Sequence, residues 1–170
     1  QAVDDIINGN PTMIDEAQAN QTLNNYFQNL QAKKSEGNIK LGNDFLEANS
    51  KKPGVFTLPS GLQYQVMKEG AGAQPTINDM VTTHYHGTFI DGKVFDSSVE
   101  RKEPATFPVN GVIAGWTEAL QLMKEGAKWK LFVPYNLAYG ERGSRGGIPP
   151  YSALIFEVEL LKVEKQDAKK

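Results

Sequence analysis

The sequence has no cysteine, only two histidines and no long apolar run. Without cysteine, disulfide bonds, thiol nucleophiles and thiolate metal sites are excluded, and the composition is compatible with any redox compartment. A membrane-spanning helix needs about 18 or more consecutive apolar residues. Because no such run occurs, we expect no membrane-spanning helix in this sequence.

The chain also lacks an excess of charge of either sign. Its 18 basic and 20 acidic residues give a net charge of -2, and no basic cluster with interleaved aromatic residues occurs. A nucleic-acid-binding surface depends on such a cluster, so we expect no nucleic-acid partner. With 170 residues, of which 39% are hydrophobic, the chain can bury one core and carry a smaller appended element.

A long helix is predicted from about residue 14 to residue 50. This stretch has no proline, and two groups of apolar residues recur at helical spacing: Leu23, Tyr26, Phe27 and Leu30, then Leu41, Phe45 and Ala48. Thr12 is typical of a helix start, and Lys51-Lys52-Pro53-Gly54 is typical of a helix end. Between Gln31 and Lys40 the apolar stripe is thin, so we expect this middle part to be exposed to solvent.

After Pro59 the apolar period changes from helical to alternating. Val81, Thr83 and Tyr85 alternate with polar residues, and two more stretches, 128–133 and 154–160, do the same. Asp91-Gly92 is typical of a tight turn before Val94. Trp116, Leu120 and Met123 mark one side of a short helix that is expected to end at Glu125-Gly126.

This pattern predicts an α+β fold in which a curved antiparallel β-sheet is wrapped around a short helix and preceded by a long N-terminal helix. We expect two parts, a helical extension over residues 1–55 and a second domain over residues 56–170.

Three common kinds of site find little support in the sequence. His84 and His86 share one face of a strand, but no third metal ligand is suggested nearby, so solvated sheet-face histidines are the simpler interpretation. No Gly-x-Ser-x-Gly motif exposes a serine nucleophile. The glycine-rich segment 140–147 lacks the Lys-Ser/Thr ending of a phosphate-binding loop. We expect no metal and no cofactor.

Three short segments concentrate one carboxylate and one phenol among apolar side chains. They are Val94–Ser98, Val112–Trp116 and Ala138–Gly140. Such a composition favours a small apolar pocket with few polar groups, which suits a neutral ligand.

The order of these segments resembles that of FKBP-type peptidyl-prolyl cis-trans isomerases. The resemblance covers residues 58–163 and rests on His84-Tyr85-His86-Gly87-Thr88, Asp91 to Ser98, Phe107, Val112-Ile113-Ala114-Gly115-Trp116, Pro134, Ala138-Tyr139-Gly140 and Ile148-Pro149-Pro150. The long helix followed by Leu58-Pro59-Ser60-Gly61-Leu62 resembles the bacterial branch that includes the macrophage infectivity potentiator (Mip-like) proteins.

The resemblance implies roles for individual residues. Asp96 is expected to polarise or orient the substrate amide at the edge of the pocket, and Tyr139 to donate a hydrogen bond to a substrate carbonyl. The expected substrate-binding residues are Tyr85, Phe95, Phe107, Val112, Ile113, Trp116, Ile148 and Phe156. From the residue pattern alone, apolar residues at these spacings belong to the core more often than to a pocket. On the same pattern, Asp96 is explained as a turn-capping residue and Tyr139 as a buried tyrosine whose hydroxyl is paired.

The resemblance also implies partners and a location. Its members act on proline-containing peptides and unfolded protein clients, and many bind macrolides such as FK506 and rapamycin. Mip-like proteins are typically exported to the periplasm or outer membrane and dimerise through helices upstream of the long one, and Val3, Ile6 and Ile7 are expected to end such a helix. Two alternatives remain open, a holdase that binds proline-containing segments and an adhesive protein in which the long helix is the functional part.

Overall fold

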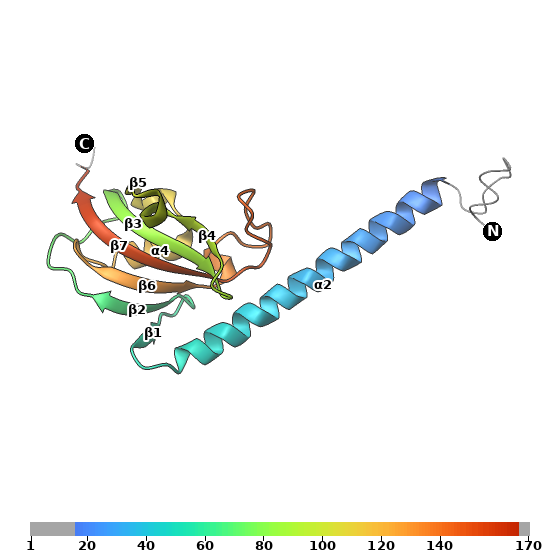
Figure 1. Ribbon diagram of the computed structural model, residues 1–170, viewed down its shortest axis with the longest axis horizontal. Coiled ribbons are helices and arrows are strands. Elements are labelled where there is room, and N and C mark those ends of the chain that lie inside the picture. The colour runs from blue at the N-terminus through green and yellow to red at the C-terminus, as the bar shows by residue number, and fades with distance from the viewer. Residues whose placement is uncertain (1–15, 167–170) are drawn as a thin grey trace. The chain divides into compact units, whose positions relative to one another are not determined.

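The computed structural model describes residues 16–166, in which one long helix precedes an antiparallel sheet with short helices (Figure 1). The elements in chain order are α2 (Glu16–Ser50), β1 (Val55–Thr57), β2 (Gln63–Lys68), β3 (Met80–Phe89), β4 (Val94–Ser97), α3 (Ser98–Arg101), β5 (Ala105–Pro108), η1 (Val109–Gly111), α4 (Ala114–Leu120), β6 (Lys128–Val133), η2 (Tyr135–Leu137) and β7 (Leu154–Glu164). The predicted fold class is therefore confirmed. Contacts divide the chain into two units between Gly37 and Asn38.

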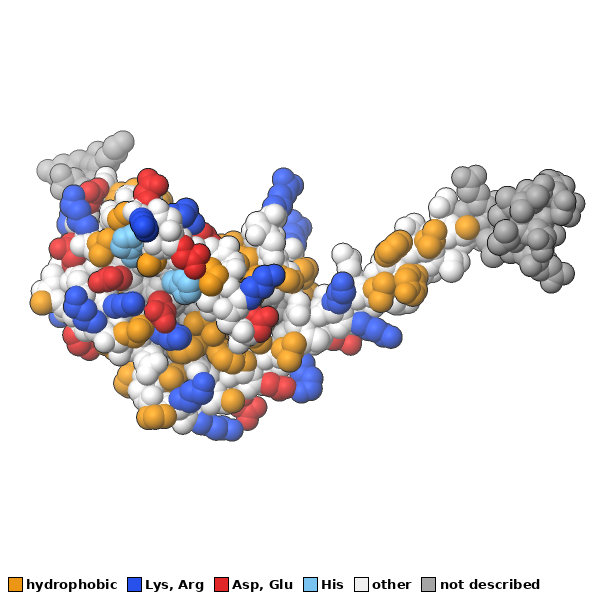
Figure 2. Space-filling view, in the orientation of Figure 1, with side chains coloured by type: hydrophobic (Ala, Val, Ile, Leu, Met, Phe, Trp, Pro, Cys, Tyr) orange, Lys and Arg blue, Asp and Glu red, His pale blue; other side chains and the backbone are white. Residues whose placement is uncertain are grey.

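The first part of α2, up to Gly37, exposes its apolar stripe. Leu23, Tyr26 and Phe27 are 52%, 59% and 60% exposed, and Leu30 is 38% exposed. Figure 2 shows hydrophobic side chains gathered on this part of the helix. No helix within residues 16–166 is long and apolar enough to cross a membrane. The expected helix start at Thr12 and the apolar residues Val3, Ile6 and Ile7 lie outside the described residues.

The last part of α2, from Asn38 to Ser50, belongs to the second unit. The ring of Phe45 lies 6.0 Å from that of Phe132 in β6. Asn49 is buried and its Nδ2 donates a hydrogen bond to Gln63 Oε1 at 2.9 Å, while Gln63 Nε2 donates to the Leu46 carbonyl at 2.8 Å. These bonds pair both ends of the buried Gln63 amide and the Nδ2 of Asn49, groups that would otherwise cost free energy. They therefore fix this part of the helix to the sheet.

The seven strands form one antiparallel sheet in the order β1-β2-β6-β7-β3-β4, with β5 also paired to β3. In β3 the side chains alternate between buried and partly exposed, so that Val81, Thr83 and Tyr85 face inward as the period of two predicts. Strand β7 alternates in the same way opposite β3, with Tyr85 paired to Val158. The turn at Asp91-Gly92 is also as predicted, because Gly92 has φ +89 and the Gly92 N–H donates to the Phe89 carbonyl.

The core lies between the inner face of the sheet and helix α4. Trp116, Ala119 and Leu120 of α4 are at most 4% exposed and pack with buried residues from β3, β6 and β7. The helix ends at Leu120, so the predicted end at Glu125-Gly126 was wrong. Met123 is nevertheless buried, because the N–H groups of Leu122 and Met123 both bond to the Ala119 carbonyl and form one more turn.

Candidate active site

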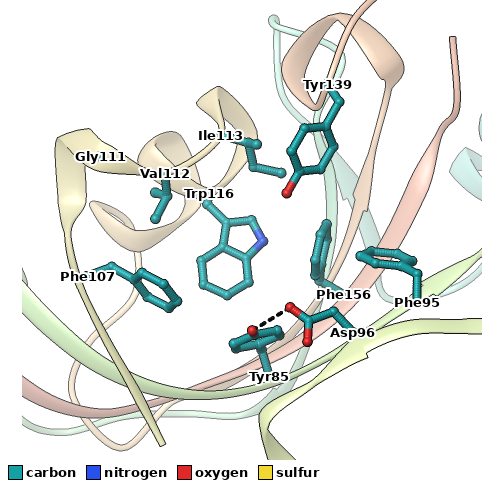
Figure 3. A pocket seen from close by; sticks show the side chains of 10 residues that line it. All are labelled: Tyr85, Phe95, Asp96, Phe107, Gly111, Val112, Ile113, Trp116, Tyr139 and Phe156. Atoms are coloured by element: carbon teal, nitrogen blue, oxygen red, sulfur yellow. Dashed lines mark hydrogen bonds between the residues drawn. The ribbon is translucent and has the colours of Figure 1, made fainter. Parts of the chain in front are cut away.

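A cavity of about 420 Å³ opens between α4 and the inner face of the sheet (Figure 3). Strands, helices and loops from residue 85 to residue 156 contribute to its lining, which consists of Tyr85, Phe95, Asp96, Phe107, Gly111, Val112, Ile113, Trp116, Tyr139 and Phe156. The size is that of a small-molecule or side-chain pocket. Every residue that the sequence predicted for the site, Ile148 excepted, therefore lies around one cavity.

Trp116 is the centre of an aromatic cluster within this cavity. Its ring meets those of Tyr85, Phe107 and Phe156 edge to face, with centroids 5.4, 6.0 and 5.3 Å away and interplanar angles between 80° and 88°. Such T-shaped pairs contribute about 0.5–1.5 kcal/mol each beyond the burial of apolar area. Because three neighbours hold it, the 4% exposed Trp116 forms a rigid wall of the cavity.

The absence of a side chain at Gly87 makes room for this cluster. A Cβ atom there would lie 2.7 Å from Phe95 Cζ and 3.0 Å from Phe156 Cε1, distances too short for non-bonded carbon atoms. Phe95 and Phe156 consequently approach the backbone of β3 and meet each other edge to face at 5.5 Å. Gly87 thereby sets the depth of the cavity on this side.

Asp96 is held at the edge of the cavity by two partners. The Tyr85 hydroxyl donates to Asp96 Oδ2 at 2.6 Å, and the Arg101 guanidinium donates to the other carboxylate oxygen and, at 2.9 Å, to the Tyr85 hydroxyl. Burial alone would raise the pKa of Asp96, but the bonds from Tyr85 and Arg101 and the charge of Arg101 outweigh it and hold the pKa below its usual value. At neutral pH the carboxylate is therefore ionised and fixed in orientation.

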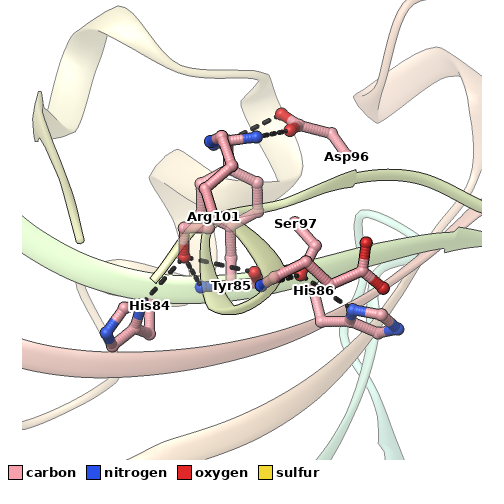
Figure 4. Close-up of polar contacts among 8 residues, drawn as sticks. His84, Tyr85, His86, Asp96, Ser97 and Arg101 are labelled. Carbon is pink, nitrogen blue, oxygen red and sulfur yellow. Dashed lines mark hydrogen bonds and ion pairs between the residues drawn. The ribbon is translucent and has the colours of Figure 1, made fainter. Parts of the chain in front are cut away.

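Helix α3 brings Arg101 to this carboxylate (Figure 4). Ser97 caps the helix, because its side chain accepts a hydrogen bond from the Glu100 N–H at 3.2 Å. The helix ends at Arg101, and the C-cap residue Lys102 takes a left-handed conformation with φ 58. This single turn places Arg101 beside Asp96 across the short connection.

Residues that line the cavity carry hydrogen-bond donors without a partner in the described residues. The Tyr139 hydroxyl, the Ile113 N–H and the buried indole N–H of Trp116 make no hydrogen bond within residues 16–166. Burial, followed by the charge of Asp96, raises the pKa of Tyr139, so its hydroxyl keeps its proton at neutral pH. The site can thus offer a few neutral donors and one carboxylate to a ligand that is otherwise apolar.

Ile148 and the two histidines lie outside the cavity lining. Ile148 is only 6% exposed and packs in the hydrophobic core, where its carbonyl accepts from the Ser144 N–H. His84 Nδ1 lies 3.0 Å from Ser98 Oγ, and His86 Nδ1 lies 2.9 Å from Ser97 Oγ (Figure 4). Within residues 16–166, no group of three or more His, Cys, Asp or Glu side chains is arranged to hold a metal ion.

Two residues of the site were missed by the sequence analysis. Gly111 lines the cavity, and Arg101 binds the carboxylate of Asp96. A signal for Arg101 was present, because Ser97 and Glu100 have the spacing of a capping box. That motif predicts a helical turn directly after Asp96, and such a turn carries Arg101 back toward the carboxylate.

Comparisons with known proteins agree with this geometry. Residues 71–161 match the family model described as FKBP-type peptidyl-prolyl cis-trans isomerase, and residues 1–66 match that of the domain amino terminal to it. The chain is 57% identical over 136 residues to the FKBP-type 22 kDa peptidyl-prolyl cis-trans isomerase of Escherichia coli, which covers 80% of this chain and 64% of that protein.

Two further relatives span nearly the whole chain. Outer membrane protein MIP of Legionella longbeachae is 45% identical over 172 residues, which cover 97% of this chain and 74% of that protein. The crystal structure of FkpA from Escherichia coli superimposes with a TM-score of 0.82 at 40% identity and covers 96% of this chain and 79% of that chain. The chain therefore belongs to the FKBP-type peptidyl-prolyl cis-trans isomerase family, with Mip and FkpA proteins among its relatives.

Proposed function

We propose that the chain accelerates cis-trans isomerisation of Xaa-Pro peptide bonds in proline-containing peptides and unfolded protein clients. The observation that carries this proposal is the aromatic cavity around Trp116, with the Asp96 carboxylate at its edge and the unpaired Tyr139 hydroxyl opposite. The cavity can take a proline ring, and its few polar groups can hold the adjoining amide. The family assignment supports the same reaction.

The reaction breaks no covalent bond. An Xaa-Pro bond rotates over a barrier of about 18–20 kcal/mol, which corresponds to a spontaneous rate on the order of 0.01–0.3 per second. To reach about 100 turnovers per second, the site must bind the twisted amide roughly 3.5–5.5 kcal/mol more tightly than the planar one. Twisting removes amide resonance and makes the carbonyl less polar, so an apolar cavity favours the twisted form.

The aromatic side chains and the polar groups of the cavity have separate roles in this proposal. Trp116 lies beneath the proline ring, and the other aromatic side chains enclose it. The Asp96 carboxylate orients the amide, while the Tyr139 hydroxyl and the Ile113 N–H donate hydrogen bonds to substrate carbonyls. The core residue Ile148 remains a candidate for contact with the substrate at the rim only if the surrounding loop moves.

Isomerisation of a short Leu-Pro or Phe-Pro peptide tests the proposal. We expect the purified chain to accelerate the reaction, with kcat/KM falling about ten- to a hundredfold in Asp96→Ala and about three- to tenfold in Tyr139→Phe, since a charged partner contributes more than a neutral one. Asp44→Ala and Tyr64→Phe are matched controls because both residues lie outside the cavity. A folded parent chain without activity would contradict the proposal.

A holdase is the second candidate function. The same cavity would capture proline-containing segments even if their rotation were not accelerated. The two functions are separated by measuring the aggregation of an unfolded client beside peptide isomerisation. Suppression of aggregation by a parent chain that leaves the peptide rate unchanged would favour the holdase.

Location and further partners belong to the same proposal. We propose a periplasmic or outer-membrane location, which the name of the Legionella longbeachae relative supports. We also propose that FK506 and rapamycin compete with peptide for the cavity, because each macrolide would pack against Trp116, where the proline ring is proposed to bind. Fractionation of source cells and inhibition of the peptide assay by either macrolide test these two points.

A further inference from the structure

The residue proposed to donate to the substrate, Tyr139, lies at the start of a long irregular loop. The loop connects η2 to β7 and contains one isolated bridge, between Ser144 and Ile148. Ordered loops of more than about 12–15 residues without regular structure are uncommon, and function is one usual reason for them. The position of the Tyr139 hydroxyl therefore depends on whatever fixes the base of this loop.

Two backbone hydrogen bonds close that base. The Tyr151 N–H donates to the Gly140 carbonyl at 2.9 Å, and the Gly140 N–H donates to the Tyr135 carbonyl at 2.8 Å. Tyr151 takes a left-handed conformation with φ 57, which is unfavourable for a bulky residue and persists only where neighbouring contacts enforce it. The Tyr135 ring provides one such contact, at a centroid distance of 5.1 Å.

The other contact comes from helix α2, far away in the sequence. Asn38 Nδ2 donates to the carbonyl of Pro150 at 2.8 Å, directly before Tyr151. One turn further along, α2 approaches the loop so closely that a Cβ atom at Gly42 would lie 3.1 Å from Ala153 Cβ. Helix α2 therefore touches the loop on the segment that precedes β7.

Packing around this bond is open. A groove of about 360 Å³ lies between α2, the loop and the turn that joins β3 to β4, and is lined in part by Asn38, Leu41, Pro149 and Ser152. Side chains in a close-packed interior hold one another in place without any single hydrogen bond. Beside a groove, in contrast, the bond from Asn38 is a main restraint on the Pro150–Tyr151 peptide.

We propose that Asn38 is a positioning residue for the active site. Its bond to the Pro150 carbonyl holds Tyr151 in the left-handed conformation, the Tyr151 N–H then holds the Gly140 carbonyl, and this fixes the adjacent Tyr139. The inference rests on the proposed function, because it assigns to α2 a part in binding the substrate. The contacts then run from the helix to the loop and from the loop to the Tyr139 hydroxyl.

Kinetics of the full chain test the proposal. Asn38→Ala removes the donor, and the isosteric Asn38→Asp places a carboxylate against the Pro150 carbonyl. We expect kcat/KM on a Leu-Pro peptide to fall about two- to tenfold in the first variant and further in the second. The loss is expected in KM, because a displaced Tyr139 weakens the binding of planar and twisted amide alike. Asn43→Ala and Asn43→Asp are matched controls on the exposed side of the same helix.

A double-mutant cycle separates positioning from a general loss of structure. If Asn38 acts through Tyr139, Asn38→Ala lowers kcat/KM in the parent chain but not in the Tyr139→Phe chain. Equal losses in both backgrounds would overturn the proposal.

Hydrogen exchange provides a readout that does not depend on activity. We expect the Tyr151 amide to exchange faster in Asn38→Ala than in Asn43→Ala, with the amides of β3 and β7 unchanged. A parent chain without isomerase activity would overturn the proposed function, and exchange at Tyr151 would then decide alone whether Asn38 holds the loop. An active parent with unchanged exchange and kinetics in Asn38→Ala would overturn the positioning role.

Discussion

Arg101 controls both the charge and the orientation of Asp96. Because its bonds help to hold the pKa of Asp96 below the usual value of about 3.9, the carboxylate stays ionised as the pH falls through that value. In Arg101→Gln, partial burial remains while the positive charge is lost, so the pKa of Asp96 rises. We predict that the variant loses peptide isomerisation at a higher pH than the parent, and that kcat/KM at neutral pH falls about three- to thirtyfold.

The pH dependence of stability should follow the same sign. A carboxyl group with a lowered pKa in the folded state stabilises the fold above its unfolded pKa, and this stabilisation disappears as the pH falls through the folded pKa. Arg101→Gln should therefore reduce stability at neutral pH more than at strongly acidic pH. Arg145→Gln, on the exposed loop, is the control. If the isomerisation rate and the stability of Arg101→Gln fall at the same acidic pH as those of the parent, Arg101 does not set the charge of Asp96.

For single residues, short sequence motifs predicted which side chains line the cavity, but not which side chains bond to each other. Asp96 and Tyr139 could be named from short segments, and both line the cavity. The ion pair between Arg101 and Asp96 forms because α3 directly follows the end of β4, and the spacing of apolar residues does not indicate it. Ile148 was expected among the substrate-binding residues from the family resemblance, but it is buried in the hydrophobic core.

Strand β3 contributes to the site through Gly87, where an added methyl group has no room. We predict that Gly87→Ala displaces Phe95 and Phe156, destabilises the chain by about 1–3 kcal/mol as overpacking does, and raises KM for the peptide. Gly37→Ala is the matched control, since nothing lies within 4 Å of a Cβ there and alanine favours a helix. Urea denaturation and peptide kinetics measure both effects. An unchanged KM in a folded Gly87→Ala chain would contradict this account of the cavity.

Among elements, those with one buried face were predictable and those defined by distant contacts were not. The alternation along β3 and β7 reflects burial against α4, so the sequence carries it directly. The end of α4 was misplaced because Met123 continues the apolar spacing beyond Leu120 through a turn rather than through the helix. The pairing order of the strands follows from contacts between distant segments, which no local pattern contains.

At the scale of the whole molecule, the long helix is continuous in sequence pattern but divided in its contacts. Its period predicted one element, and the structure has one helix from Glu16 to Ser50. The division after Gly37 arises from Asn38, Phe45 and Asn49, which contact the loop and the sheet. We propose that the functional domain extends into α2, beyond the boundary at residue 55 that the sequence suggested.

Two truncations test this boundary. Removal of residues 1–37 leaves every contact of the second unit, so we predict unchanged stability and unchanged activity on a short peptide. Removal of residues 1–55 takes away Phe45 and leaves the buried Gln63 without its bonds to Asn49 and Leu46. We predict that it lowers the free energy of unfolding by about 3–5 kcal/mol. Urea denaturation of both truncated chains measures this difference, and equal stability would place the boundary at residue 55. If only the removal of residues 1–55 lowers the free energy of unfolding, the end of α2 is part of the catalytic fold. The exposed apolar residues before Gly37 then do not contribute to the stability of that fold.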